Sequence, residues 1–461
     1  MRSALRRGGL SAAVFGLAVL GQVAFAETVT LSLDQARHAA GQALLAGDPA
    51  LAVALARRLL EAEPKDAYAL LILAAGEQQM GDPASGRRDG RTAWAAAKGL
   101  PGLRYEIARH TALATLQSGA PIAAAFWLRR AVETAPDAAA RSQSLQDLTT
   151  LRARSRLNYA FNLAMTPSAN LNGGASGGFL IIDDSLIVGP LSGSAQALSG
   201  LRLAETLTAS YGISASDQAV TRVGVQLFAT QNSFSAAAKA QAPDLQAADL
   251  NQTTVEVNLA KDYLFTQDQP VPLSATLALG RSAVGGNDSG PYLRFGLNGP
   301  LAAGSDWVLS GRFGAERHWR TLDRIDATSF GLQQSRKLPG GSSIGWSVTT
   351  ARVTGQAVNQ TYDSLAAAMT YAKAKPVGPV TLSGSLSVGF DRYPLYMLGP
   401  FQVTNGRTDR HLDLAVTATF ANWHVLGYAP NLTVNLGHTW SNISRYETDE
   451  ISATLGYKSV F

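Results

Sequence analysis

The spacing of apolar residues changes once along the chain, near residues 152–156. Before this point alanine and leucine recur at helical intervals, as in LDQARHAAGQALLAGDPALAVALARRLLEAEP. After it, apolar and polar residues alternate, and in LNYAFNLAM (157–165) the odd positions are Leu, Tyr, Phe, Leu and Met. Helical spacing predicts amphipathic helices, and alternation predicts strands with one apolar face. The pattern therefore predicts an all-α part followed by an all-β part.

The helical part is divided by three Gly-x-Pro turns, whose glycines are Gly47, Gly81 and Gly119. These glycines are 34 and 38 residues apart, and a further proline follows each of them. A period near 34 residues built from helix pairs is typical of tetratricopeptide repeats. Residues 27–150 are therefore predicted to form a tetratricopeptide-like array. An all-α spacer without a binding role is the alternative.

The strand part contains about fourteen alternating runs between Arg156 and Phe461. One face of each run carries Leu, Val, Phe, Tyr or Trp, and the other carries Gly, Ala, Ser, Thr and Asn. Charges are scattered on the second face: Arg222, Glu256, Arg294, Arg312, Glu316, Glu450 and Lys458. In a transmembrane barrel the apolar face meets lipid and the small or polar face lines the lumen. A soluble β-sandwich is the alternative.

The connections support a barrel, because long segments (166–200, 230–252 and 393–407) alternate with short turns. Outer-membrane barrels have long surface loops and short periplasmic turns. Aromatic residues near strand ends suit interfacial girdles: Tyr263, Phe265, Trp307, Trp319, Phe420 and Trp440. The predicted fold class is an α + β membrane protein. It has a short all-α array followed, over residues 151–461, by an antiparallel transmembrane β-barrel of ~14 strands.

The ends of the chain predict its compartment. Arg2, Arg6 and Arg7 precede an apolar run at 10–23, and Ala24-Phe25-Ala26 is a small-x-small cleavage site. Residues 1–26 are therefore predicted to be a secretory signal peptide cleaved after Ala26, with an uncleaved anchor helix as the alternative. The predicted location is the bacterial outer membrane, with the helical domain in the periplasm. At the other end, alternating residues close on phenylalanine, which is typical of the signal read by the barrel-assembly machinery: Ile451, Leu455, Tyr457 and Phe461.

Composition excludes several kinds of chemistry. The chain has no cysteine, so disulfides, thiol chemistry and a lipobox are absent. Its net charge of +5 includes the three signal arginines, and no basic stripe suggests nucleic-acid binding. None of the six histidines forms a closely spaced pair, and we expect no metal and no cofactor. Residues 174–178 match G-x-S-x-G but lie in a glycine-rich stretch after a strand, so we expect no catalytic site and no enzyme.

The segment LNYAFNLAMTPSANLNGGAS (157–176) resembles the start of the barrel in the surface lipoprotein assembly modulator (Slam) family. Pro167, Asn170 and Asn172 match that family's Pro-x-x-Asn-x-Asn motif, and Tyr446-Glu447-Thr448-Asp449 resembles its Y-x-x-D stretch. The resemblance implies a translocon that moves a client from periplasm to cell surface. The client is a surface lipoprotein or a secreted haem- or metal-acquisition protein.

The same resemblance implies periplasmic chaperones or clients as partners of the helical array. It leaves open whether the client passes through the lumen or through a seam between the first and last strands. Two other functions fit the domain order: an exopolysaccharide-export barrel, and a diffusion porin with a periplasmic helical domain.

Overall fold

The computed structural model describes residues 31–183, 188–265, 271–320 and 323–459. The predicted signal peptide with Ala24 and Ala26, and the predicted assembly residue Phe461, lie outside these residues. The chain forms two compact units, residues 1–96 and 97–461. Among the described residues, none of the helices combines the length and the apolarity needed to cross a bilayer.

The first unit consists of four helices joined by tight turns. They are α1 (Leu33–Leu45), α2 (Pro49–Ala62), α3 (Ala67–Gln79) and α4 (Pro83–Ala96). Gly47 and Gly81, with φ angles of 81° and 87°, end α1 and α3 in the left-handed region that glycine adopts without strain. A proline then starts the next helix, where its missing N–H costs nothing. The Gly-x-Pro turns thus produce helix pairs, as predicted.

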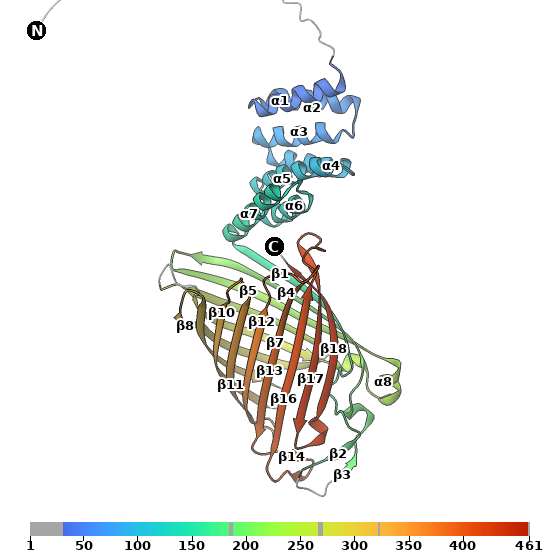
Figure 1. The fold of residues 1–461 in the computed structure, drawn as a ribbon, viewed down its shortest axis with the longest axis vertical. Helices are drawn as coiled ribbons and strands as arrows, with labels where there is room; N and C mark the ends of the chain where they lie inside the picture. The colour runs from blue at the N-terminus through green and yellow to red at the C-terminus, as the bar shows by residue number, and fades with distance from the viewer. Residues whose placement is uncertain (1–30, 184–187, 266–270, 321–322, 460–461) are drawn as a thin grey trace, which may run out of the picture. The chain divides into compact units, whose positions relative to one another are not determined.

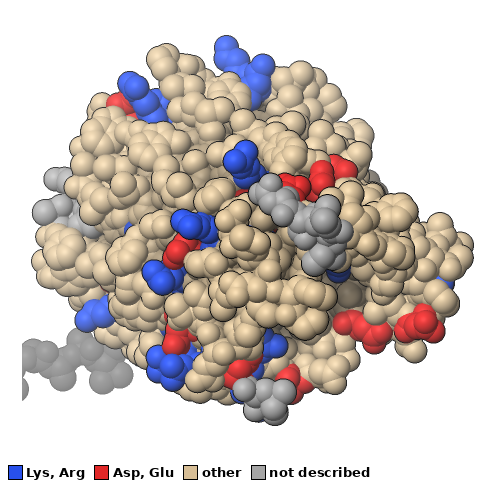
Figure 2. Space-filling model, turned by 90° about the horizontal axis from the view of Figure 1, so that it is seen from below, with Lys and Arg blue, Asp and Glu red and all other residues tan. Residues whose placement is uncertain are grey.

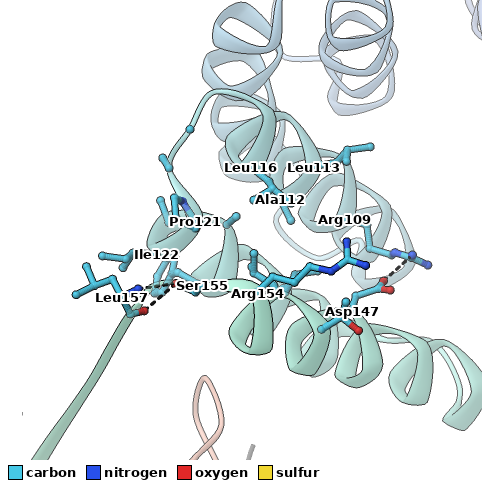
Figure 3. Close-up of a pocket in the computed structure, with 18 of the residues that line it drawn as sticks. Arg109, Ala112, Leu113, Leu116, Pro121, Ile122, Asp147, Arg154, Ser155 and Leu157 are labelled. Carbon is cyan, nitrogen blue, oxygen red and sulfur yellow. Dashed lines mark hydrogen bonds and ion pairs between the residues drawn. The ribbon is translucent and has the colours of Figure 1, made fainter. Parts of the chain in front are cut away.

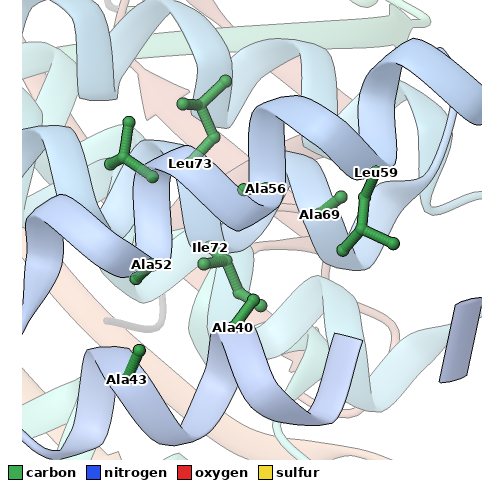
Figure 4. Packing of buried hydrophobic residues seen from close by; sticks show 9 residues of the cluster. Ala40, Ala43, Ala52, Ala56, Leu59, Ala69, Ile72 and Leu73 are labelled. Atoms are coloured by element: carbon green, nitrogen blue, oxygen red, sulfur yellow. The ribbon is translucent and has the colours of Figure 1, made fainter. Parts of the chain in front are cut away.

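Small side chains let these helices pack closely (Figure 4). Ala40, Ala52, Ala56 and Ala69 are fully buried, and they surround Ile72 in one cluster. Alanine has a high helix propensity and no bulk, so it favours both the helix and a short interhelical distance.

The second unit begins with three more helices, α5 (Pro101–Gln117), α6 (Pro121–Thr134) and α7 (Ala138–Arg154). Gly119, with a φ of 78°, separates α5 from α6 and repeats the turn of the first unit. After α7, Ser155 ends the helix and β1 (Leu157–Ser168) starts. The change of hydrophobic period near residues 152–156 is therefore the boundary between helix and strand.

Fourteen antiparallel strands close into a barrel (Figure 1). After β1 they are β4 (Gly200–Ala215), β5 (Ala219–Phe234), β6 (Gln252–Tyr263), β7 (Leu273–Val284), β8 (Asn287–Ala303), β9 (Trp307–Trp319), β10 (Arg324–Lys337), β11 (Ser343–Gly355), β12 (Tyr362–Ala372), β13 (Thr381–Tyr393), β16 (Arg407–Thr419), β17 (Tyr428–Ser441) and β18 (Thr448–Ser459). Each strand pairs with its neighbours in the chain, and β1 pairs with β18 to complete the ring. The predicted fold class is confirmed.

The two faces of the barrel differ as the alternation predicts. On β6, Val255, Val257 and Leu259 are 46%, 49% and 47% exposed, whereas Glu256 between them is 4% exposed. Large apolar side chains thus point outward and polar side chains point inward. An apolar outer surface is what a lipid bilayer requires of a spanning barrel.

The three longest connections lie at one end of the barrel, which we call the outer end. The β1–β4 connection contains the hairpin of β2 (Phe179–Ile181) and β3 (Val188–Pro190), the β5–β6 connection contains α8 (Ala236–Gln241), and the β13–β16 connection contains β14 (Met397–Leu398) and β15 (Phe401–Gln402). Figure 1 shows these hairpins at the end of the barrel away from the start of β1.

Candidate functional site

The junction between β1 and β18, which we call the seam, has the fewest register pairs of any strand pair in the barrel among the described residues. β1 is in register with β4 at twelve successive pairs, from Leu157–Tyr211 to Ser168–Gly200. It is in register with β18 only at Ala164–Gly456, Met165–Leu455 and Ser168–Ser452. Within the described part of β18, Asn162 and Leu163 have no register partner there. Among the described residues, the seam is therefore paired at 164–168 of β1, and the positions that would face the first residues of β1 lie outside the described part of the chain.

Proline weakens the seam further. The N–H of Ala169 donates to the carbonyl oxygen of Ile451 at 3.1 Å, so this nitrogen faces β18. Position 167 lies two residues earlier and faces the same way, but Pro167 has no N–H to donate. A contact between the Oγ1 atoms of Thr166 and Thr454, 2.9 Å apart, is one of the few side-chain links across the strands.

The other two residues of the family motif fasten the outer end of the seam. Asn170 is 7% exposed, accepts from the N–H of Gly174 at 2.8 Å, and donates to the carbonyl oxygens of Gly174 and Asp449 at 2.9 and 3.3 Å. Asp449 belongs to β18. Asn172 accepts from the N–H of Leu198 at 2.9 Å and donates to the carbonyl oxygen of Gln196 at 2.9 Å. The motif therefore shapes the β1–β4 connection and ties it to the last strand.

The G-x-S-x-G match lies in this same connection. The N–H and Oγ of Ser176 both donate to the carbonyl oxygen of Glu447, at 2.9 and 3.2 Å. A nucleophile elbow needs a strand that leads directly into a helix, and Ser176 is instead followed by the β2–β3 hairpin. The geometry gives this serine a role in loop packing.

Buried side chains from several connections pack together at the outer end beside the seam. Ile182, Tyr396, Val403 and Ile443 form a buried cluster that joins three connections. The Arg407 guanidinium lies 3.4 Å from the centre of the Tyr446 ring and bonds Asp409 at 2.5 Å. Figure 2 views this end, where basic and acidic side chains lie beside one another on a largely uncharged surface.

The inner face of the barrel carries small side chains and charges that are paired along the wall. Arg294 bonds both carboxylate oxygens of Glu256, at 2.7 and 2.6 Å, and the Tyr292 hydroxyl donates to the same group at 2.8 Å. Arg222 pairs with Asp262, which also accepts from Ser274. Neutralised charges leave a lumen that is polar without a strong field of one sign.

One set of side chains on the inner face has the composition of a metal site. A ligand atom from each of Asp391, Asp409 and His411 lies within 4.8 Å of the others. Both Asp409 oxygens are engaged by Arg407, and the two His411 ring nitrogens contact Asp391 and Thr439. A cation would have to displace these partners, so we assign none. The Asp-x-His spacing at 409–411 was the sequence signal for this group, because residues two apart share a strand face.

A large apolar groove lies at the start of β1 (Figure 3). It has a volume of about 1480 Å³ and is lined by α5, α6, the end of α7 and the first residues of β1. Leu113, Leu116, Ile122 and Phe126 line it and are between 38% and 44% exposed. An apolar patch of this kind on a helix surface indicates an interaction site.

Helix α6 also contacts the turn between β16 and β17. Arg129 donates to the carbonyl oxygen of Leu426 at 2.6 Å and lies 4.9 Å from the centre of the Tyr428 ring. Glu133 accepts from the N–H of Leu426. Burial lowers the pKa of Arg129 from its ordinary value, since the apolar surroundings disfavour the charged form.

No family model and no curated protein matches the sequence. Over about two thirds of the chain, it is similar to two solved barrels. A BenF-like porin from Pseudomonas fluorescens Pf-5 has 11% identity and a TM-score of 0.36 and covers 65% of this chain and 98% of its own. The outer-membrane protein OmpT of Vibrio cholerae, as its loop L8 deletion mutant, has 10% identity and a TM-score of 0.32 and covers 66% and 99%.

The first tetratricopeptide domain of human RPAP3 is similar to a shorter part, with 13% identity, a TM-score of 0.24 and coverage of 26% and 92%. All these TM-scores are below 0.5, and the conclusions below rest on the geometry of the chain itself.

Proposed function

We propose that the chain is an outer-membrane translocon that moves a client protein from the periplasm to the cell surface. The observation that carries the proposal is the seam, where the described residues of β1 and β18 form three register pairs, all between Ala164 and Ser168 of β1. An incompletely paired seam can separate at a lower cost than the other strand pairs, because fewer backbone hydrogen bonds are lost. The lumen then gains a lateral opening next to the helices.

The helical part supports this proposal by its position in the chain. Helix α7 continues into β1 through residues 155–156, so a client held by α5–α7 would lie at the start of the seam strand. Stacked helix pairs commonly present a concave surface for binding peptides. The proposed partners are a lipid-anchored or secreted client and periplasmic chaperones, and the barrel-assembly machinery acts on the chain itself. The proposal assigns no catalytic residue.

Two observations bear on the other candidate functions. A diffusion porin would need an open lumen, and three connections are packed together at the outer end beside the seam. An exopolysaccharide exporter would need rows of sugar-binding aromatic or acidic groups, whereas the inner-face acids Glu256 and Asp262 are paired with arginines.

Because the chain has no cysteine, a single disulfide can be introduced across the seam to test the proposal. Met165→Cys with Leu455→Cys places a disulfide across the seam, because these two residues are a register pair of β1 and β18. The matched control, Val434→Cys with Ala453→Cys, joins β17 to β18, a regular strand pair. Clients are first identified as proteins that leave the cell surface, and accumulate in the periplasm, when the gene is deleted.

Oxidation of the seam pair is expected to stop surface delivery of these clients, and reduction is expected to restore it. The control pair should leave delivery unchanged. Undiminished delivery with the seam fully cross-linked would falsify lateral opening. A large constant single-channel conductance, with no protein lost from the surface on deletion, would instead identify a porin.

A further inference from the structure

The groove between α5, α6 and β1 is continuous with the outer, lipid-facing surface of the barrel. The strand residues that line the groove are Leu157 and Tyr159 on β1 and Tyr211 on β4. All three stand at the alternate positions whose side chains point out of the barrel. Tyr159 and Tyr211 are 45% and 44% exposed. Tyrosine is enriched where the acyl chains of a bilayer meet the headgroups. The groove therefore opens towards lipid, at the level where β1 enters the membrane.

Apolar side chains from the helices complete the groove. Leu113 and Leu116 on α5 and Ile122 on α6 are each more than 40% exposed and face the same space as Leu157 (Figure 3). The volume of about 1480 Å³ exceeds the roughly 300–1,000 Å³ typical of small-molecule pockets. Its apolar lining suits hydrocarbon chains better than a polar ligand.

Basic residues stand at the point where the helices meet the strand. Arg154 and Arg156 line the groove on either side of Ser155, and both are exposed. Among the described residues neither forms an ion pair, whereas Arg109 in the same groove is bonded to Asp147 at 2.9 Å. Glu106 also lines the groove, so its three arginines exceed its two acids by one. Arginines beside a membrane surface attract anionic headgroups, and a guanidinium group binds phosphate through bidentate hydrogen bonds.

We propose that this groove binds an anionic phospholipid of the inner leaflet. Its acyl chains lie against Leu113, Leu116 and Ile122, and its phosphate lies at Arg154 and Arg156. The lipid seats the last helices on the membrane at the base of the seam strand. This inference rests on insertion of the barrel in a bilayer and is independent of client translocation.

The test uses the full-length protein in nanodiscs of phosphatidylethanolamine and phosphatidylglycerol, with the photoactivatable acyl chain carried by one lipid or by the other in parallel samples. Labelled peptides are mapped by mass spectrometry. Label is expected on α5 and α6 in addition to the outer face of the barrel. Leu116→Glu with Ile122→Glu should reduce the helix label by about fivefold or more, because the carboxylates exclude acyl chains.

Matched controls separate the groove from a general membrane effect. Leu45→Glu, at an exposed position on α1, should leave the helix label unchanged. Arg154→Glu with Arg156→Glu should remove the preference for phosphatidylglycerol, whereas Arg58→Glu on α2 should not. Heat-modifiable migration on gels checks that each variant still forms a barrel.

Two results would overturn the proposal. One is a label confined to the strands, or a helix label that the groove substitutions do not change. The other is displacement of the label by a triacylated lipopeptide but not by lysophosphatidylglycerol, which would make the groove a site for the acyl anchor of a lipidated polypeptide.

Discussion

Asn170 fastens the seam through one side chain. Its amide satisfies the backbone of Gly174 within the β1–β4 connection and the carbonyl of Asp449 on β18. A buried amide with both ends engaged is costly to remove, because its partners stay buried without bonds. The residue thus matters for where the barrel closes and not for any chemistry.

Asn170→Ala is expected to lower the free energy of unfolding by about 1–3 kcal/mol, because it leaves buried backbone groups unsatisfied. It should also speed amide hydrogen exchange in residues 447–452, measured by mass spectrometry in detergent. Asn158→Ala, at an exposed position on the same strand, is the control and should change neither quantity. Equal exchange in the two variants would contradict the role given to Asn170.

Glu205 is a carboxylate on the lipid-facing side of the barrel. It lies on the same face of β4 as the exposed residues Leu201, Leu207 and Tyr211. In the neighbouring strand β1 it is opposite Leu163. Apolar residues precede and follow it on this face, so it lies within the apolar band. Ionised groups on the lipid face of a barrel are unfavourable.

Glu205→Leu is expected to raise the free energy of unfolding in lipid vesicles by about 1 kcal/mol, since a carboxylate leaves the hydrocarbon region. Glu450→Leu, on the inner face of β18, is the comparison and should not stabilise. If Glu205→Leu stabilises the barrel but reduces client delivery, the carboxylate is retained for contact with a partner in the membrane. A loss of stability would contradict its outward placement.

At the scale of elements, β1 and β18 differ from the other barrel strands, because each has one extensively paired neighbour and one neighbour that it pairs at three positions. β1 pairs with β4 along its whole length and with β18 at three positions. Its proline faces the poorly paired side. Strand prolines are confined to edges and bulges because they cannot donate to a ladder, and β1 therefore behaves in part as an edge strand.

Pro167→Ala restores a donor towards β18 and is expected to stabilise the seam by about 0.5–1.5 kcal/mol. Slower hydrogen exchange in β18 would report this, and client delivery should fall. Pro291→Ala, on β8 away from the seam, provides the matched control. The expectation fails if both substitutions slow exchange in β18 equally.

Helix α3 carries a buried carboxylic acid, Glu77, whose pKa is raised above its ordinary value. Burial, followed by the hydrogen bond to Asp89, raises the pKa of Glu77 from 4.5 to about 7, although Arg57 acts in the opposite direction. Because the folded state holds this proton more tightly, the contribution of Glu77 to stability is complete below pH 4.5 and is lost as pH rises to 7.

The first unit is therefore expected to lose about 1–3 kcal/mol of stability between pH 4.5 and pH 7 through this group. Thermal unfolding of the helices, followed by circular dichroism while the barrel stays folded, measures the slope. Glu77→Gln should flatten it, and Glu61→Gln, at an exposed position on α2, should not. An unchanged slope in Glu77→Gln would show that another group titrates.

Several of these elements could be predicted from the sequence, and the reasons are local. Gly47, Gly81 and Gly119 have the positive φ angles that a glycine before a helix-starting proline suggests, and strand parity follows from alternation. The seam could not be predicted in this way. Its small number of register pairs, the cluster around Ile443, and the approach of Asp391 to His411 depend on residues that are distant in sequence. The motif residues were identified, but their partners Asp449 and Leu198 were not.

At the scale of the whole molecule, the second unit joins helices and barrel through two kinds of link. One is the covalent junction at residues 155–156, and the other is the contact of α6 and α7 with the turn that contains His424 and Leu426. A pulling force on α7 is therefore resisted at β16–β17 while it acts on β1. This arrangement couples the helices to one strand of the seam.

Arg129→Ala with Glu133→Ala is expected to release α6 from the turn, at a cost of about 2 kcal/mol or more because both groups bond the backbone there. Limited proteolysis should then cut faster near residue 155, and client delivery should fall while the barrel stays folded. Arg58→Ala, on the first unit, is the control. Unchanged cleavage would indicate that the contact adds no restraint.

Pro167 also bears on how the barrel assembles. The contact across the seam between Thr166 and Thr454 spans 288 residues of sequence, so among the strand pairs of the barrel the seam carries the largest loop-closure entropy and is expected to form last. Until then the barrel is an open sheet whose two edge strands are β1 and β18. Exposed edge strands pair with other chains and cause aggregation, and a proline, which has no backbone N–H to donate, is one of the features that prevent this. Pro167 thus weakens the seam of the folded barrel and also protects the edge strand β1 from aggregation before the barrel closes.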